Sequence, residues 1–418
     1  KKIFVYILIL TTCYQISIAQ SNNNFSWPKI TRDTKPWVRW WWLGNAVDTP
    51  GLKFNLESFN HADIGGVEIT PIYGVKGYEN KFIDYLSPKW MQMLHYTINK
   101  SHELNMGVDM NTGTGWPFGG PQININDAAS RVIFQTYQLK SGEHLSQKIS
   151  VNNPRQKKVA VLQMLMAYSD KGDKIDLTKK VDTAGNLDWT ELSGNWQLIA
   201  VFDGKTLQKV KRASPGGEGL VMDHFSKQAV DDYLQRFTTA FANNNWPPPH
   251  AFFNDSYEVF GADWTKNLFT EFEKQRGYKL QDYLPALMSK GNEDTVTRVI
   301  ADYRETLSEM LLKNFTETWT QWAHQMHSIT RNQAHGSPGN LLDLYSAVDI
   351  PEIESYGSSH FDIPGLPEDS LGGRPGELDP LLLKFASSAA HVSGKKFASS
   401  ETFTWLGEHF RVSLSQCK

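Results

Sequence analysis

The chain has 418 residues, with 42 Lys plus Arg against 45 Asp plus Glu and a formal net charge of −3 at pH 7. This length allows one barrel with an insertion or two to three smaller domains. The near balance of charge argues against a nucleic-acid or anionic-membrane partner. The 14 Trp and 15 Tyr residues suit a sugar-binding cleft, although large α/β cores also use tryptophan.

The first 20 residues predict a secretory signal peptide. Lys1 and Lys2 precede an apolar run over residues 3–10, and small residues end at Ala19. The apolar run is too short for a permanent membrane span. We therefore expect removal of residues 1–19, export to the periplasm or the medium of a bacterium, and no membrane partner after cleavage. Lipidation at Cys13 is the alternative, but Thr12 before the cysteine argues against it.

Cysteine is scarce, since only Cys13 and Cys417 occur. Cleavage of the signal peptide would leave a single cysteine. Neither an intramolecular disulfide nor a cysteine-based zinc site could then form.

Strand-like and helix-like segments alternate from residue 37 onward, which predicts parallel βαβ units. The predicted strands are 37–43, 66–70, 107–110, 251–253, 328–334, 350–355 and 396–400. The predicted helical regions are 51–62, 87–105, 223–242 with Asp223 as the N-terminal cap, 263–327, 339–347 and 381–393.

The pattern changes between residues 131 and 219, where short alternating runs separated by Gly, Asn and Asp predict an antiparallel β-rich insertion. The expected domains are then a first part of the catalytic barrel at 20–130, the insertion at 131–219, and an incomplete second part at 220–418. Seven strands without an eighth predict an α/β fold of the (β/α)8 TIM-like barrel type, truncated before strand 8. A seven-stranded open sheet is the alternative.

Carboxylates stand where several predicted strands end, at Glu258, Glu352, Glu354 and Glu401. In a parallel barrel the strand ends on one face carry the active site. A pair of carboxylates gathered there is the usual apparatus of glycoside hydrolysis. This pattern is the strongest functional signal in the sequence.

Each carboxylate also has a simpler interpretation. A close Asp255 and Glu258 would raise each other's pKa, as a general acid requires, but they could equally cap a turn and face solvent. Glu401, after two serines, suits a polar pocket or a helix N-terminus. Glu352 and Glu354 alternate onto one face of a strand, so they could hold Ca²⁺ or pair with Arg39 or another base.

Five segments, taken together, resemble glycoside hydrolase family 106, the bacterial α-L-rhamnosidases. They are Pro36 to Asn45 (PWVRWWWLGN), the Gly- and Trp-rich loop Gly113 to Pro121, Asn254 to Glu258 (NDSYE), Asp349 to Glu352, and Ser399 to Phe403 (SSETF). The resemblance implies a (β/α)8 catalytic domain, inversion of configuration and a calcium ion near the bound rhamnose. It also implies β-rich domains after the barrel, which we expect to be missing from this chain.

The resemblance implies roles for individual residues. Glu258 would protonate the leaving oxygen, Glu401 would activate water, and Asp255 would position Glu258. The candidate substrate-binding residues are Trp41, Trp42, Asn45, Trp116, Glu354 and His335, and the candidate calcium ligands are Glu352 and Glu354.

The predicted function is an inverting glycoside hydrolase that releases α-L-rhamnose from rhamnose-containing oligo- or polysaccharides. A retaining barrel glycosidase for another sugar is one alternative. A non-catalytic carbohydrate-binding protein is the other.

Overall fold

The computed structural model describes residues 29–190, 193–242, 246–354, 381 and 384–402. The predicted signal peptide, both cysteines and Phe403 lie outside the described residues. Export and cleavage after Ala19 therefore stay predictions.

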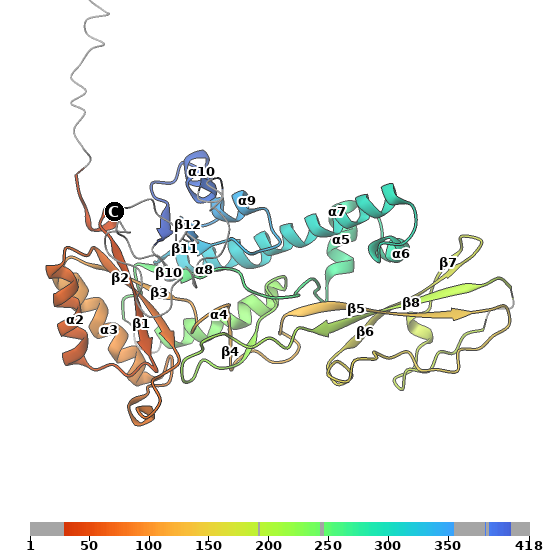
Figure 1. Ribbon diagram of the computed structural model, residues 1–418, viewed down its shortest axis with the longest axis horizontal. Coiled ribbons are helices and arrows are strands. Elements are labelled where there is room, and N and C mark those ends of the chain that lie inside the picture. Colours follow the sequence, from red (N-terminus) through yellow and green to blue (C-terminus); the bar gives the residue numbers. More distant parts are fainter. Residues whose placement is uncertain (1–28, 191–192, 243–245, 355–380, 382–383, 403–418) are drawn as a thin grey trace, which may run out of the picture.

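A seven-stranded parallel sheet lies in the left part of the molecule in Figure 1, and its strands are ordered as they occur in the chain. The strands are β1 (Trp37–Leu43), β2 (Gly66–Ile72), β3 (Gly107–Asn111), β10 (Ala251–Asn254), β11 (Ile329–Gln333), β12 (Ile350–Glu354) and β13 (Ser399–Glu401). Each neighbouring pair runs parallel. The seven predicted strands and their parallel arrangement are confirmed.

The sheet is curled into a half-barrel. The guanidinium of Arg39 on the first strand lies 2.8 Å from the carboxylate of Glu401 on the last strand. It also lies 3.2 Å from Asp255, directly after the central strand β10. Edge strands of a flat sheet of this width would be too far apart for such contacts, because neighbouring strands are about 4.8 Å apart. Closure into a complete barrel stays a prediction.

Helices cover the outer face of the half-barrel. They are α2 (Thr49–His61), α3 (Pro88–Glu103), α4 (Lys227–Ala242), α8 (Thr318–Gln325), α9 (Leu341–Ser346) and α10 (Lys384–Val392). Apolar side chains that point outward from the strands pack on them, as Trp42 does on Trp90 of α3 and Phe252 on Trp322 of α8. The predicted helix start at Ser87 is confirmed, since its side chain accepts a hydrogen bond from the backbone N–H of Trp90 at 3.3 Å.

The predicted cap at Asp223 is wrong. Helix α4 begins four residues later, at Lys227, and Ser226 Oγ accepts the hydrogen bond of Ala229 N–H at 3.3 Å. Asp223 is buried instead, and it accepts hydrogen bonds from the N–H of Phe225 and the hydroxyl of Thr265. An aspartate satisfies a local turn as readily as a helix end, so its pattern alone does not distinguish the two.

The predicted helical region at 263–327 consists of several helices. Gly277 (φ 78°) ends the first of them in a left-handed conformation. The region contains α5 (Leu268–Arg276), η4 (Leu280–Tyr283), α6 (Leu284–Leu287), α7 (Glu293–Met310), the π-helical η5 (Leu311–Glu317) and then α8. Three short helices lie elsewhere, η1 (Arg32–Thr34), η2 (Glu79–Lys81) and η3 (Thr178–Lys180).

An antiparallel sheet separates β3 from α4 along the chain and lies at the right of Figure 1. Its strands, in order, are β5 (Ser130–Leu139), β8 (Trp196–Lys205), β6 (Val161–Ser169) and β7 (Lys174–Asp176), and β4 (Gly119–Gly120) pairs with β9 (Leu220–Val221) nearby. The sheet has its own apolar core on one face, whereas Met166, Ile199 and Val201 on the other face join the main core. The domain boundaries stay predictions.

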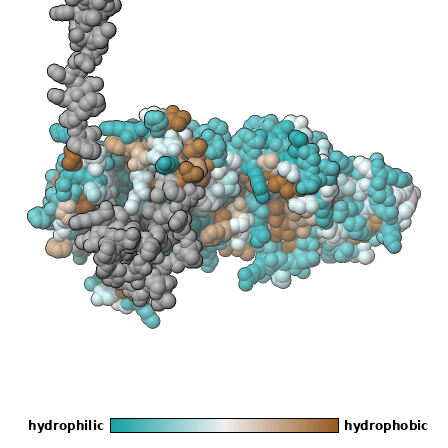
Figure 2. All heavy atoms as spheres, turned by 45° about the horizontal axis from the view of Figure 1, so that its top comes forward, coloured by the Kyte–Doolittle hydropathy of each residue, from teal (hydrophilic) through white to brown (hydrophobic). Residues whose placement is uncertain are grey.

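The surface around this sheet is mainly polar. On the face that Figure 2 shows, hydrophilic residues cover most of the end that carries the antiparallel sheet and α7. Among the described residues, no helix is both long enough and apolar enough to cross a membrane.

Candidate active site

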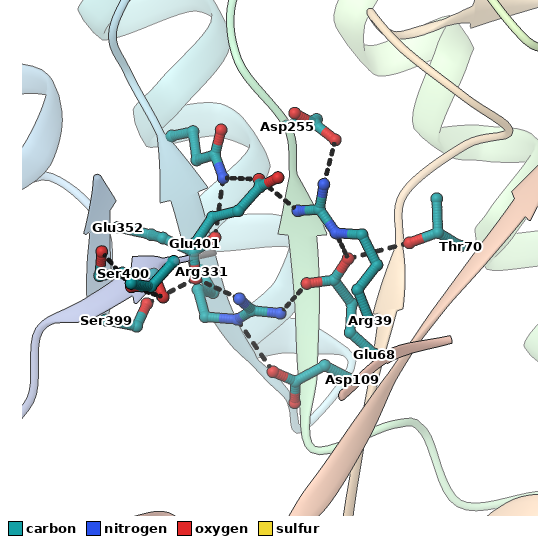
Figure 3. A network of polar contacts seen from close by, with 12 residues as sticks. Arg39, Glu68, Thr70, Asp109, Asp255, Arg331, Glu352, Ser399, Ser400 and Glu401 are labelled. Carbon is teal, nitrogen blue, oxygen red and sulfur yellow. Dashed lines mark hydrogen bonds and ion pairs between the residues drawn. The ribbon is translucent and has the colours of Figure 1, made fainter. Parts of the chain in front are cut away.

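The inner face of the half-barrel is lined with charged and amide side chains (Figure 3). Side chains on a strand alternate between the two faces, so residues two apart share the inner face while those between them join the outer core. The inner residues that contact one another include Arg39, Glu68, Thr70, Asp109, Arg331, Gln333, Glu352, Ser399 and Glu401, together with Asp255 just beyond β10.

Arg39 connects three elements of the half-barrel. Its Nε lies 3.0 Å from Glu68, its Nη1 3.2 Å from Asp255, and its Nη2 2.8 Å from Glu401. The guanidinium also lies over the ring of Phe253, 5.1 Å from its centre. Burial disfavours its charge, but the surrounding carboxylates more than offset this and raise the pKa of Arg39. Arg39 is therefore a fixed cation among three carboxyl groups.

Arg331 holds a second set of carboxylates deeper in the half-barrel. It forms ion pairs with Glu68 and Glu352, and its Nε lies 3.0 Å from Asp109. Glu68 thus bridges the two arginines. Burial opposes the charge of Glu352, yet Arg331 and Arg39 hold its pKa below the ordinary value. This part of the network is held together by ion pairs to Arg331.

Asp255 and Glu401 differ from Glu352, because their pKa values are raised. Burial raises the pKa of Glu401 to about 7, with Arg39 opposing the shift and Asp255 adding to it. Burial also raises the pKa of Asp255, again against Arg39 and with a contribution from Glu68. With a pKa near neutral pH, Glu401 can both take up and release a proton during a reaction.

Glu258 lies apart from this network, in the loop after β10. Its carboxylate forms an ion pair with Lys211, and its backbone carbonyl accepts a hydrogen bond from Gln208 Nε2 at 2.7 Å. Among the described residues, no hydrogen bond or ion pair joins Glu258 to Glu401 or Asp255. The structure thus places Asp255 and Glu401 on one shared arginine and Glu258 beside a separate lysine.

Two tryptophans, Trp41 and Trp116, connect Arg39 with the segment around Glu258. Arg39 is stacked on Trp41, whose ring centre is 6.5 Å from that of Trp116. The backbone of Trp116 exchanges hydrogen bonds with that of Lys211, at 3.2 and 2.8 Å. Trp41 is 41% exposed, so part of its ring is available to a ligand. Trp41, Trp116 and Lys211 thus form a continuous wall from Arg39 to Glu258.

The other predicted binding residues have varied environments. Trp42 is buried on the helix-covered face and does not reach the inner face. Asn45 is also buried, and it donates hydrogen bonds to Ile83 O at 2.9 Å and Ser214 Oγ at 3.0 Å. His335 and Glu354 contact each other at 3.2 Å, at the ends of β11 and β12.

The arrangement of the predicted calcium ligands does not fit calcium. The carboxylate of Glu352 is already paired with Arg331 and accepts hydrogen bonds from Gln333 at 2.8 Å and Ser399 at 2.6 Å. Glu354 contacts His335. In the described part of the chain, no three acidic, histidine or cysteine side chains form a group that could hold a metal ion. Calcium prefers six to eight oxygen ligands, which these two paired glutamates do not offer.

Several residues of the network were missed by sequence reasoning. Glu68 and Asp109 are charged residues inside mainly apolar strands, and such buried charges are rare unless they are paired. That signal could have identified them, whereas Arg331 lies in the mainly polar strand β11 and has no such signal. Lys211 lies in a loop without a pattern, and nothing in the sequence indicates its proximity to Glu258.

A cavity of about 660 Å³ opens along the inner face between the edge strands β1 and β13. This volume is in the usual range for small-molecule sites. Its lining includes Arg39, Glu68, Asp109, Arg331, Glu352, Ser399 and Glu401, but neither Asp255 nor Glu258.

Comparison with known proteins identifies the relatives of this chain. Glycoside hydrolase family 106, described as alpha-L-rhamnosidase, matches residues 29–169 and 156–418. A curated protein of Formosa agariphila named "Putative beta-glucuronidase" is 24% identical over 436 residues, which cover 93% of this chain and 35% of that protein. The structure of a rhamnosidase from Novosphingobium sp. PP1Y is similar with a TM-score of 0.72 at 16% identity, over 89% of this chain and 52% of that one. The chain thus spans about a third and about half of the length of these two relatives.

Proposed function

Because the chain belongs to glycoside hydrolase family 106, we propose that it carries the catalytic centre of an inverting α-L-rhamnosidase for rhamnose-containing oligo- or polysaccharides. One observation carries the proposal. Two carboxyl groups, the buried Asp255 and the half-buried Glu401, share the cation Arg39 at the carboxyl ends of parallel strands, and both have raised pKa values.

Glu401 is proposed as the general base. A base is most effective when its pKa lies near the working pH, and burial raises the pKa of Glu401 to about 7. The hydrogen bond from Gln333 Nε2, at 2.6 Å, and the ion pair with Arg39 fix the carboxylate in place. It could then take a proton from a water molecule that attacks the sugar.

Glu258 is proposed as the general acid at the other end of the tryptophan wall. The two glutamates have separate cation partners, Lys211 and Arg39, so they act as independent groups rather than as one shared-proton pair. An inverting enzyme needs carboxyl groups roughly 6.5–9.5 Å apart to admit a water molecule. Asp255, which pairs with Arg39, would position Glu258 at the bond that breaks.

The charge of the inner face favours a neutral sugar. In the described residues, six carboxyl groups (Glu68, Asp109, Asp255, Glu352, Glu354 and Glu401) face two guanidinium groups, which already have carboxylate partners. A sugar with its own carboxylate would be repelled there. Rhamnose is neutral, so it suits this face better than a glucuronide, the substrate named for one relative.

The central experiment is hydrolysis of an aryl α-L-rhamnoside by the protein and its Glu258→Gln and Glu401→Gln variants. Each variant should lose about 10²–10⁴-fold in kcat, the usual contribution of a general acid or base. Glu103→Gln is the matched control, because Glu103 lies exposed on the outer helix α3. Proton NMR of the first product should show β-L-rhamnose if configuration is inverted.

Three results would contradict parts of this proposal. Initial release of α-L-rhamnose would indicate a retaining enzyme. Turnover of an aryl β-glucuronide but not of the rhamnoside would mean that the substrate is a β-glucuronide. Sugar binding without turnover of either compound would favour a carbohydrate-binding protein.

Export belongs to the same proposal. Mass spectrometry of the protein from its native host should find an N-terminus at Gln20, and an uncleaved N-terminus would contradict export.

A further inference from the structure

Two adjacent basic residues, Lys211 and Arg212, lie on the rim of the candidate site. They follow the antiparallel sheet in sequence, after β8. Lys211 contacts Glu258 and lies over the ring of Phe260, 4.6 Å from its centre. Because Lys211 already has a carboxylate partner, Arg212 is the better candidate for binding an anionic ligand.

Arg212 has aromatic neighbours but no acidic one in the described part of the chain. Its Nη1 donates a hydrogen bond to the hydroxyl of Tyr73 at 2.9 Å. Its guanidinium lies 5.8 Å from the ring centre of Tyr73 and 5.6 Å from that of Trp116. No ion pair to Arg212 is present among the described residues, and the residue is exposed. Several N–H donors of a flat cation are therefore available to a ligand.

The backbone holds this arginine in a fixed place. Arg212 O accepts a hydrogen bond from the N–H of Tyr73 at 3.0 Å, which ties the segment to the end of β2. Arg212 also has φ 54°, a left-handed conformation that disfavours a residue with a side chain. At Gly115, a Cβ atom would lie 1.8 Å from Lys211 O, so the Gly-rich loop and this segment are in close contact. Such local strain is typical of functional sites.

The rim has a definite position relative to the proposed chemistry. Glu258, the proposed general acid, must face the leaving group, and Lys211 joins Glu258 to the segment that carries Arg212. Trp116 contacts both Trp41 and Arg212 and so connects the inner face with the rim. The aromatic and basic rim therefore lies on the leaving-group side of the site.

We propose that this rim is a subsite for a leaving-group sugar that carries a carboxylate, that is, a uronic acid. The inference rests on the function proposed above. The guanidinium of Arg212 would bind the carboxylate through two parallel hydrogen bonds, a geometry that arginine offers and lysine does not. The rings of Tyr73 and Trp116 would support the sugar beside it. The enzyme would then remove neutral rhamnose from an acidic neighbour.

The test compares two disaccharides that differ in one group. One is an α-L-rhamnosyl uronic acid, and the other is the same compound with its carboxylate reduced to an alcohol. We expect the protein to prefer the acidic compound, and Arg212→Gln to lower the ratio of the two kcat/KM values about 10- to 100-fold, as loss of a charged hydrogen bond implies. Arg212→Lys should retain only part of the ratio.

The matched control is Arg298→Gln, since Arg298 is 75% exposed on α7 and pairs only with Asp294 among the described residues. The ratio of its kcat/KM values for the two disaccharides should equal that of the wild-type protein. An unchanged ratio in Arg212→Gln, or a wild-type protein without preference for the acidic compound, would overturn the proposal.

The proposed function and the subsite can fail separately. If an aryl α-L-rhamnoside is not hydrolysed, the proposed function fails. The subsite is then judged by calorimetric binding of the acidic disaccharide to the protein and to Arg212→Gln. Equal affinities would overturn the subsite, and weaker binding to the variant would support it.

Discussion

The arginines inside the half-barrel and the arginine on its rim have different partners, and the difference separates structure from recognition. Inside the half-barrel, Arg39 and Arg331 each contact three carboxylates. On the rim, Arg212 contacts a phenol and two aromatic rings. A buried cation requires partners because desolvation is costly, whereas an exposed one does not. The inner arginines therefore position acidic groups, and the outer one is available to bind a ligand.

The largest expected effect is on folding, through Arg331. Replacement by Met would leave Asp109 and Glu352 without their arginine and Glu68 with Arg39 alone, and it should lower the free energy of unfolding by about 3–5 kcal/mol. Urea denaturation measures this change. The double variant Arg331→Met, Glu352→Gln removes one of the orphaned charges and should recover part of the loss. A double variant no more stable than the single one would show that these charges are not coupled.

The next effect is on catalysis, through Arg39. The variant Arg39→Gln should lose about 100-fold in kcat/KM, because Asp255 and Glu401 lose their common anchor. Arg39 lowers the pKa of Glu401, so its removal should raise that pKa above about 7.

The pH–rate profile of Arg39→Gln then identifies the role of Glu401. If Glu401 is the base, the acidic limb of the profile should move to higher pH. Movement of the alkaline limb instead would assign Glu401 as the acid. An unmoved profile would contradict any catalytic role.

A smaller effect concerns the pH dependence of stability. The pKa of Glu401 is raised from 4.5 to about 7 in the folded state, so its contribution to stability is fully present below pH 4.5 and is lost as the pH rises through 7. The side chain introduced by Glu401→Gln cannot ionise, so this variant should not lose stability in this way as the pH rises. Between pH 4.5 and 7.5, the wild type should lose ~1–2 kcal/mol more than the variant, after allowance for partial exposure. Parallel stability curves would contradict the raised pKa.

The smallest effect is expected at the rim. Arg212→Gln should change the free energy of unfolding by less than about 0.5 kcal/mol, as is usual for exposed substitutions. Thermal unfolding of Arg212→Gln and of Arg331→Met under the same conditions measures the difference between the two settings. A loss comparable to that of Arg331→Met would mean that Arg212 is a structural residue and that the two settings do not differ.

The strands could be predicted from the sequence because their apolar runs and the helices between them follow simple periods. The candidate carboxylates at the strand ends could be identified for the same reason, since parallel strands end at one edge. Helix starts were harder, and Asp223 shows why, because a capping residue serves turns equally well.

The partners of the carboxylates could not be predicted. Arg39 meets Glu401 only because the sheet curls, and curvature leaves no mark in a single sequence. Glu352 was expected to bind calcium or a base such as Arg39, and it pairs with Arg331. The pairing of Lys211 with Glu258 depends on a loop conformation.

The antiparallel sheet interrupts the half-barrel between its third and fourth strands, and this affects the order in which the protein can fold. Arg39 and Asp255 are 216 residues apart, and Glu68 and Arg331 are 263 apart. Contacts over such separations form slowly, since long loops must close before the contacts give any gain. The antiparallel strands, by contrast, join residues much nearer in sequence. We therefore expect the charged centre to assemble after the antiparallel sheet, which can act as an early folding unit.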